Sequence, residues 1–194
     1  SVDCVADIDV SRAKATAERY GIPRTVSTVE EALEGSVIDF VDVCTPAFAH
    51  RDVVITAAQA GKHVVCEKPF ALTGSDALEM TEACRQAGVK LMVAFRHRFT
   101  RWASIVRERM LRGDLGRPII WREVLASSGP KMRYMFDRDK AGGFFMDFYV
   151  HHIDMGHYLF GESRSVLAVG GSLKAALPSP DTGTAVVTFE QGDQ

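Results

Sequence analysis

The chain lacks both a strong net charge and a long apolar run. It has 23 Lys and Arg against 25 Asp and Glu, which gives a formal net charge of −2. This balance argues against a protein that binds nucleic acid or an anionic membrane over a broad surface. No apolar run approaches the roughly 20 residues that cross a bilayer, so we expect no membrane partner.

Cysteine is scarce and scattered. The four cysteines, Cys4, Cys44, Cys66 and Cys84, form no C-x-x-C motif and have no histidine at metal-ligand spacing. A structural zinc site is therefore not expected, and the thiols are typical of reduced core residues. The first residues also lack a basic segment followed by an apolar one. We accordingly expect a cytoplasmic protein.

The composition, with 46% hydrophobic and 25% charged residues, is that of an ordinary globular protein. In the first half, predicted strands alternate with predicted helices of up to about 14 residues. The strands are 2–6, 37–44, 63–66 and 89–95, and the helices are about 9–20, 28–33, 47–60 and 75–87. Such alternation is typical of right-handed βαβ units and a parallel sheet of the Rossmann kind.

The second half has a different pattern. We predict helices over 99–111 and from Gly142-Gly143 to Phe160, and strands over 118–126, 166–173 and 184–190, with 127–141 irregular. Helices beside consecutive strands indicate an α/β domain with a mostly antiparallel sheet. We place the boundary near Arg98, which gives domains 1–98 and 99–194.

Polar residues gather where the predicted parallel strands end, and ligands of open parallel sheets bind at that edge. These residues are Asp7, Thr45-Pro46, Glu67-Lys68-Pro69 and Arg96-His97-Arg98. Asp7 is placed to accept the two hydroxyls of an adenosine ribose. Its alternative role is an acid at a helix N-terminus, for which Asp9 competes.

Glycine occurs 16 times but never as G-x-G, the pattern of the phosphate-binding loop in dinucleotide folds. The ribose-binding acid follows that loop by roughly 20 residues. Counting back from Asp7 places the loop before Ser1. We therefore expect the sequence to be an internal piece of a longer protein.

Lys68 follows an apolar strand and precedes Pro69, which makes a stiff corner. A lysine there can donate to a substrate oxygen or transfer a proton. The alternative is an exposed surface lysine that only ends a strand.

The apolar helix after Gly142-Gly143 carries one polar stripe. Asp147, His151 and Asp154 are spaced by four and three residues, so they share a face. A histidine accepts protons near neutral pH, and an acid one turn away can orient it. A satisfied structural pair is the alternative. A metal site with His152 and His157 is not expected, because the spacing is not H-E-x-x-H.

Residues 96–112 contain six arginines and one glutamate. The apolar stripe of Trp102, Ile105, Val106 and Met110 makes a solvated helix face a simpler interpretation than nucleic-acid binding. Arg96 and Arg98, directly after a strand, are better candidates for substrate or cofactor contacts.

Three segments together resemble the Gfo/Idh/MocA family of NAD(P)-dependent oxidoreductases, which act on sugars, cyclitols and related hydroxyl compounds. They are the run from Ala60 through Glu67-Lys68-Pro69, the run from Gly88 to Phe95, and Gly142-Gly143 followed by Asp147, His151 and Asp154. The resemblance implies a nucleotide-binding domain followed by an α/β domain whose sheet often mediates oligomerisation. We therefore expect a homo-oligomer through the second-domain sheet.

The resemblance also implies roles for single residues. Lys68 matches the family's catalytic lysine, and Asp147 and His151 match its catalytic Asp and His. On the cofactor side it implies Asp7, Thr45, Pro46, His50, Glu67, Lys68 and Arg96. Asp7 points to NAD rather than NADP, since its carboxylate would repel a 2′-phosphate. Only Arg12 lies near enough to offset this.

Two residues depart from the family pattern. Ala47 stands where the Thr-Pro-Asn-x-x-His turn usually has Asn, and Arg96 stands where Asn or Gln is common. The predicted function is hydride transfer between NAD and a secondary hydroxyl of a small sugar or polyol. The alternative is an NAD-binding regulator of the same fold without turnover.

Overall fold

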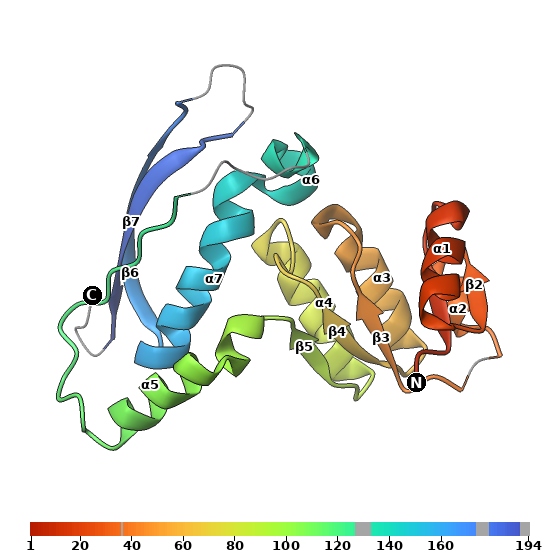
Figure 1. Ribbon diagram of the computed structural model, residues 1–194, viewed down its shortest axis with the longest axis horizontal. Helices are drawn as coiled ribbons and strands as arrows, with labels where there is room; N and C mark the ends of the chain where they lie inside the picture. The colour runs from red at the N-terminus through yellow and green to blue at the C-terminus, as the bar shows by residue number, and fades with distance from the viewer. Residues whose placement is uncertain (36, 127–132, 174–178, 191–194) are drawn as a thin grey trace. The chain divides into compact units, whose positions relative to one another are not determined.

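The computed structural model describes residues 1–35, 37–126, 133–173 and 179–190. The chain forms two compact units, Ser1–Val93 and Ala94–Gln194. Figure 1 labels the helices and strands of both units.

The first unit alternates short strands with helices. Its elements are β1 (Cys4–Ala6), α1 (Val10–Tyr20), β2 (Arg24–Val26), α2 (Val29–Leu33), β3 (Phe40–Val43), α3 (Ala47–Gln59), β4 (His63–Cys66), α4 (Gly74–Gln86) and β5 (Leu91–Val93). β1 pairs with β2, and β3, β4 and β5 form a second sheet in that order. All of these pairs are parallel, as the sequence predicts. β2 is not predicted from the sequence, because it is only three residues long.

Local signals set the helix ends. The Asp9 carboxylate accepts hydrogen bonds from the backbone N–H groups of Ser11 and Arg12, and thereby caps α1. At the other end Gly21 adopts φ 65°, the left-handed conformation that glycine enters at least cost. Because Asp9 is the cap, the carboxylate of Asp7 is available for another role.

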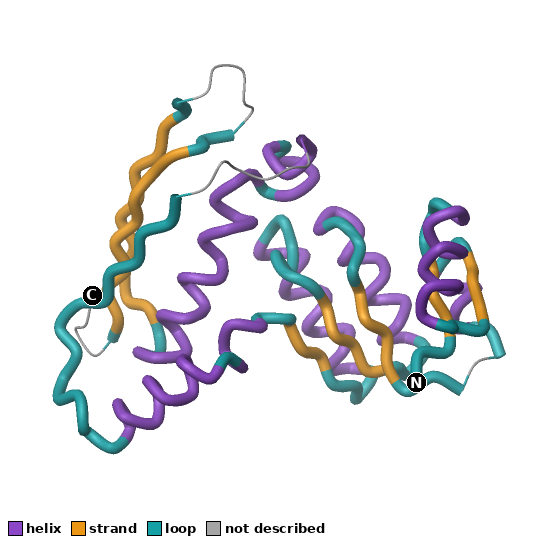
Figure 2. The backbone as a smooth tube through the Cα atoms, in the orientation of Figure 1, coloured by secondary structure: helices purple, strands orange, loops and turns teal. Residues whose placement is uncertain are grey.

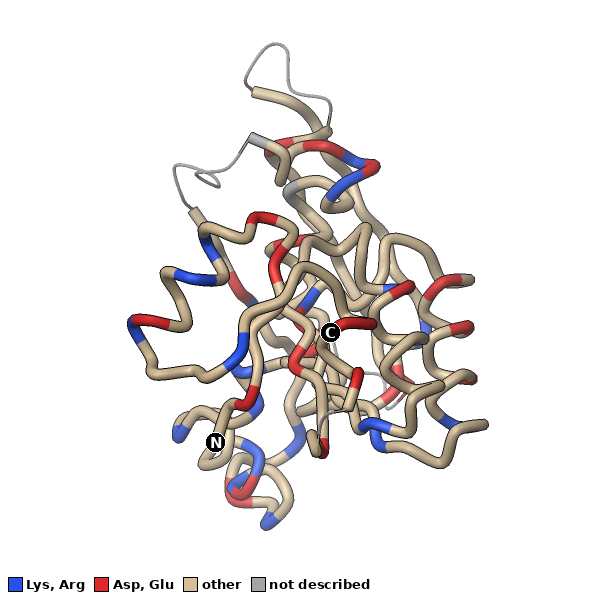
Figure 3. Tube along the Cα trace, turned by 90° about the vertical axis from the view of Figure 1, so that its right-hand side faces the viewer, with Lys and Arg blue, Asp and Glu red and all other residues tan. Residues whose placement is uncertain are grey.

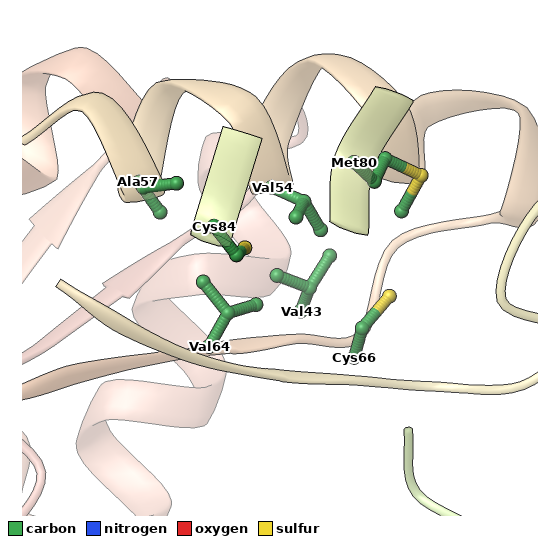
Figure 4. Packing of buried hydrophobic residues seen from close by; sticks show 8 residues of the cluster. Val43, Val54, Ala57, Val64, Cys66, Met80 and Cys84 are labelled. Atoms are coloured by element: carbon green, nitrogen blue, oxygen red, sulfur yellow. The ribbon is translucent and has the colours of Figure 1, made fainter. Parts of the chain in front are cut away.

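The core of the first unit lies between the β3–β4–β5 sheet and the helices α3 and α4 (Figure 4). Its buried members are small or unbranched, namely Val43, Val54, Ala57, Ala58, Val64, Cys66, Met80 and Cys84. Figure 4 shows Val43, Val64 and Cys66 pointing from the strands toward Val54 and Met80 of the helices. This packing holds the carboxyl ends of β3 and β4 in a fixed register, with Val43 opposite Cys66.

The second unit is built around one long helix. Its elements are η1 (Arg96–Phe99), α5 (Arg101–Leu111), η2 (Arg133–Phe136), α6 (Arg138–Ala141), α7 (Gly143–Phe160), β6 (Ser163–Gly171) and β7 (Thr182–Phe189). β6 and β7 pair antiparallel, which confirms the predicted change of sheet type. The Phe189 side chain is buried against Phe160 and His157 of α7.

The predicted strand over 118–126 is wrong. These residues run as a loop (Figure 2), and no described segment pairs with them as a strand. Their apolar side chains favour an extended chain, but a strand exists only where a neighbour supplies hydrogen bonds. Here the packing comes from side chains: Trp121 stacks on Trp102 and meets the edge of Phe160.

Charged residues of both signs are interspersed along the chain (Figure 3). No described helix is both long enough and apolar enough to cross a membrane.

Candidate functional site

Asp7 lies directly after β1, and its carboxylate is held by two partners. Arg12 of α1 donates from Nε to Oδ2 at 3.1 Å and from Nη2 to Oδ1 at 2.8 Å. The Asp9 backbone N–H donates to Oδ1 at 2.8 Å. The hydrogen bonds from Arg12 and Asp9 lower the pKa of Asp7 below its usual value. Asp7 is therefore a carboxylate at neutral pH, which suits it to accept ribose hydroxyls.

From the sequence, Arg12 is predicted only to be a cation near Asp7. The two side chains lie five residues apart across a strand end, so helical spacing does not pair them. The guanidinium is 64% exposed and the carboxylate 31% exposed, so solvent and ligands reach both. An ion pair of this kind is weak enough for a ligand to displace.

The loops after β3 and β4 carry the next candidates. Thr45 and Pro46 are exposed between β3 and α3, and Glu67 and Lys68 are half-buried directly after β4. Val43 and Cys66, the last residues of the two strands, are register partners. The two loops therefore start at the same edge of the sheet, as the crevice rule requires.

His50, expected on the cofactor side, is buried with 1% of its surface exposed. Its ring nitrogens lie 2.8 Å from the Thr45 carbonyl oxygen and 3.1 Å from the Phe70 carbonyl oxygen. One carbonyl belongs to the loop after β3 and the other to the loop after β4. The buried His50 ring thus contacts both loops. The Thr-Pro-x-x-x-His spacing in the sequence does not reveal this role.

Lys68 occupies a tightly defined backbone position. Its N–H donates to the Glu67 carboxylate at 3.1 Å, and the Glu67 N–H donates to the Val43 carbonyl at 2.9 Å. The Lys68–Pro69 peptide bond is cis, and Pro69 is buried. Lys68 thus lies two residues after the last residue of β4, Cys66, as the sequence predicts.

The two buried cysteines of the first unit, Cys66 and Cys84, are not suited to nucleophilic chemistry. Burial raises the pKa of Cys66 to about 12, and the negative charge of Glu67 adds to the effect. Burial also raises the pKa of Cys84. Both side chains are neutral thiols at neutral pH, whereas the nucleophile would be a thiolate.

In the second unit, the polar stripe of α7 divides into two parts. Asp147 and Asp154 are both buried, with 6% and 7% of their surface exposed, and His151 between them is half-buried. Asp154 is engaged by Arg98 of η1, which donates from Nε to Oδ2 at 2.9 Å and from Nη2 to Oδ1 at 2.5 Å. Asp154 therefore matches the structural-pair alternative, and Arg98 is committed to it.

The neighbouring residues of η1 differ from Arg98. Arg96 is exposed. His97 stacks on His151, with 4.5 Å between ring centroids and 17° between ring planes. The sequence indicates His97 only as one of the polar residues after a strand, because its contact with His151, 54 positions away, leaves no trace in local spacing.

No group of three or more His, Cys, Asp or Glu side chains in the described part of the chain is arranged to hold a metal ion.

Both units match known families. Residues 1–95 match the family described as "Oxidoreductase family, NAD-binding Rossmann fold", and residues 104–194 match the "GFO/IDH/MocA C-terminal domain". The D-apiose dehydrogenase of Paraburkholderia graminis is 34% identical, covering 97% of this chain and 50% of that protein. The myo-inositol 2-dehydrogenase of Thermotoga maritima is 30% identical, covering 97% of this chain and 57% of that protein.

Solved structures agree with this result. A levoglucosan dehydrogenase in complex with NADH and levoglucosan has a TM-score of 0.88 and 28% identity over 98% of this chain and 55% of that one. A probable dehydrogenase from Thermotoga maritima has a TM-score of 0.90 and 30% identity, over 100% of this chain and 59% of that one. The chain spans about half the length of the curated relatives named above. With both of its units matched in chain order, the chain belongs to the Gfo/Idh/MocA family of oxidoreductases.

Proposed function

We propose that the protein is an NAD-dependent dehydrogenase of a secondary hydroxyl on a small sugar, cyclitol or related polyol. The observation that carries the proposal is the presence of Lys68 at the end of β4 and of Asp147 and His151 on α7, in a chain of this family. The named relatives act on D-apiose, levoglucosan and myo-inositol, which supports a compact polyhydroxylated substrate.

Each catalytic residue has a role that follows from its chemistry. His151 accepts the proton of the substrate hydroxyl, because a neutral imidazole is a base near neutral pH. Lys68 donates a hydrogen bond to the same oxygen and stabilises the negative charge that develops there. Asp147 lies one turn before His151 on α7 and orients substrate hydroxyls.

The residues at the strand ends of the first unit suit a dinucleotide. The ionised, partly exposed Asp7 carboxylate offers acceptors for the two hydroxyls of the adenosine ribose, and it disfavours a 2′-phosphate. Thr45, Pro46, Glu67 and Arg96 are the further candidates for cofactor contacts, and His50 supports the loop that carries Thr45. When bound, NAD supplies the hydride acceptor.

The test is an assay of the full-length protein on inositols, hexoses and pentoses, followed at the NADH absorbance band. We expect turnover, and we expect Lys68→Ala and His151→Ala each to reduce kcat by about 100-fold or more. Lys90→Ala and His157→Phe are matched controls outside the candidate site. NAD binding without turnover on every substrate would favour the regulator, and wild-type turnover in either alanine variant would refute that residue's role.

We further propose a homo-oligomer that forms through the second-domain sheet. One face of β6–β7 presents Leu167, Val169 and Val186, which are 71%, 68% and 45% exposed. An apolar sheet face of this kind is typical of an interaction surface. Light scattering of the full-length protein measures the assembly directly.

The four free cysteines are compatible with the reducing cytoplasm, which we propose as the compartment.

A further inference from the structure

The contact between the rings of His97 and His151 has no role in the proposed reaction as described above. The ring of His97, on η1, lies parallel to the ring of His151 at 4.5 Å, and Phe95 approaches His151 edge-on at 6.4 Å. Both histidines are half-buried. The flat face of the His151 imidazole is therefore in contact with a second imidazole from another element.

A clamp one turn further along fixes this contact. Arg98, the residue next to His97, donates two hydrogen bonds to the Asp154 carboxylate, and the Asp154 side chain is only 5% exposed. Its guanidinium also lies over the rings of Phe95 and Tyr158, at 5.8 Å and 5.5 Å from the centroids. Asp154 follows His151 by three residues, so the clamp sets the register of η1 along α7. With Arg98 held there, His97 lies over His151.

The consequence for a general base follows from side-chain torsions. The second torsion of a histidine is broad and roughly two-fold, so the ring of a base can turn away from the proton that it should accept. A parallel ring against one face restricts that rotation.

We propose that His97 is a positioning residue that holds the His151 ring in its productive orientation through face-to-face stacking. This inference rests on the proposed function of His151 as the base. It predicts that kcat depends on a flat ring at position 97 and not on the nitrogen atoms of that ring.

Two substitutions separate these properties. His97→Phe keeps a flat ring, and His97→Leu keeps an apolar side chain without one. We expect His97→Phe to retain kcat within about twofold. We expect His97→Leu to lower kcat about threefold to tenfold, which is the range of one lost aromatic pair, while the KM for NAD stays unchanged. His157→Leu is the matched control, since it removes another α7 histidine that contacts an aromatic ring, here Phe189 edge-on. It should change the melting temperature and leave kcat unaltered.

A second measurement needs no turnover. In the NMR spectrum of histidine-labelled full-length protein, the ring protons of His151 should be shifted upfield by the stacked ring of His97. The signal is assigned by its loss in His151→Gln. His97→Leu should remove the upfield shift, and His97→Phe should keep or increase it. If wild-type protein turns over no polyol, the proposed function fails and this shift still decides whether the stack exists.

Three results would overturn the positioning role. They are wild-type kcat in His97→Leu, equal losses in His97→Leu and His97→Phe, or a His151 ring signal that is the same in wild type and His97→Leu. Equal losses would indicate that the imidazole nitrogens of His97 act directly, for example on substrate. Circular dichroism of each variant shows that it is folded.

Discussion

The two units hold their candidate residues in different ways. In the first, the side chains project from loops that follow strands, and an apolar core of strands and helices keeps the strand ends in register. In the second, they project from one helix, and side-chain contacts from η1 hold that helix face: an ion pair and a ring stack. The first unit thus depends on buried volume for its site geometry, and the second depends on a few directed contacts.

The largest effect on stability is expected from a substitution in the core of the first unit. Met80 of α4 is fully buried between helices and sheet. Met80→Ala should lower the free energy of unfolding by about 2–5 kcal/mol, through lost burial and the cavity left behind. Urea denaturation measures this change. Leu78→Ala, at a 73% exposed position of the same helix, should stay within about 0.5 kcal/mol. Equal effects would show that the cluster does not control stability.

A smaller effect is expected from the clamp of the second unit. Asp154→Asn leaves the Arg98 guanidinium without its carboxylate. Because the Arg98 side chain is 39% exposed and can be hydrated, we expect a loss of about 1–3 kcal/mol, below that of a fully buried pair. Asp114→Asn, in the more exposed pair with Arg109, should cost about 0–1 kcal/mol. A negligible cost in Asp154→Asn would show that η1 is held by packing instead.

The smallest effect concerns cofactor choice. Arg12→Gln removes the cation that shares the Asp7 carboxylate with any incoming ligand. Arg12 contributes to the lowered pKa of Asp7, so its removal raises that pKa toward the usual value. At neutral pH the carboxylate remains ionised in both proteins, so only its counter-charge changes.

We therefore expect Arg12→Gln to bind NADPH more weakly relative to NADH, by no more than about fivefold, since an exposed ion pair contributes little. Titrating the NADH and NADPH fluorescence gives both Kd values. Arg19→Gln, on the last turn of the same helix, is the control. An unchanged ratio of the two Kd values would assign the selectivity to Asp7 alone.

The sequence predicts the elements whose signals are local. The Asp9 cap and Gly21 stop of α1 are sufficient to place that helix, and the apolar run after Gly143 places α7. β2 has only three residues, which is too few to show the hydrophobic pattern of a strand. The stretch 118–126 has the pattern of a strand but no strand partner among the described residues, and pairing depends on distant parts of the chain.

For the candidate site, the sequence predicts which residues are candidates for the chemistry and not how they are held. Lys68 and His151 are found from strand ends and helical spacing. Three contacts join residues from different elements: His50 with two loop carbonyls, the Arg98 guanidinium with the Asp154 carboxylate, and the His97 ring with the His151 ring. Such contacts follow from the tertiary fold, so local spacing cannot reveal them.

The positions of the cysteines allow local unfolding of the first unit to be measured by thiol alkylation. All four cysteines precede Leu91, so none lies in the second unit. Cys66 and Cys84 are protected inside the first core, and a thiol reagent reaches them only when that core opens. The rate of their alkylation therefore measures local unfolding of the first unit alone, without any engineered label. Comparing that rate in wild type and in Asp154→Asn shows whether a disturbance in the second unit is transmitted to the first.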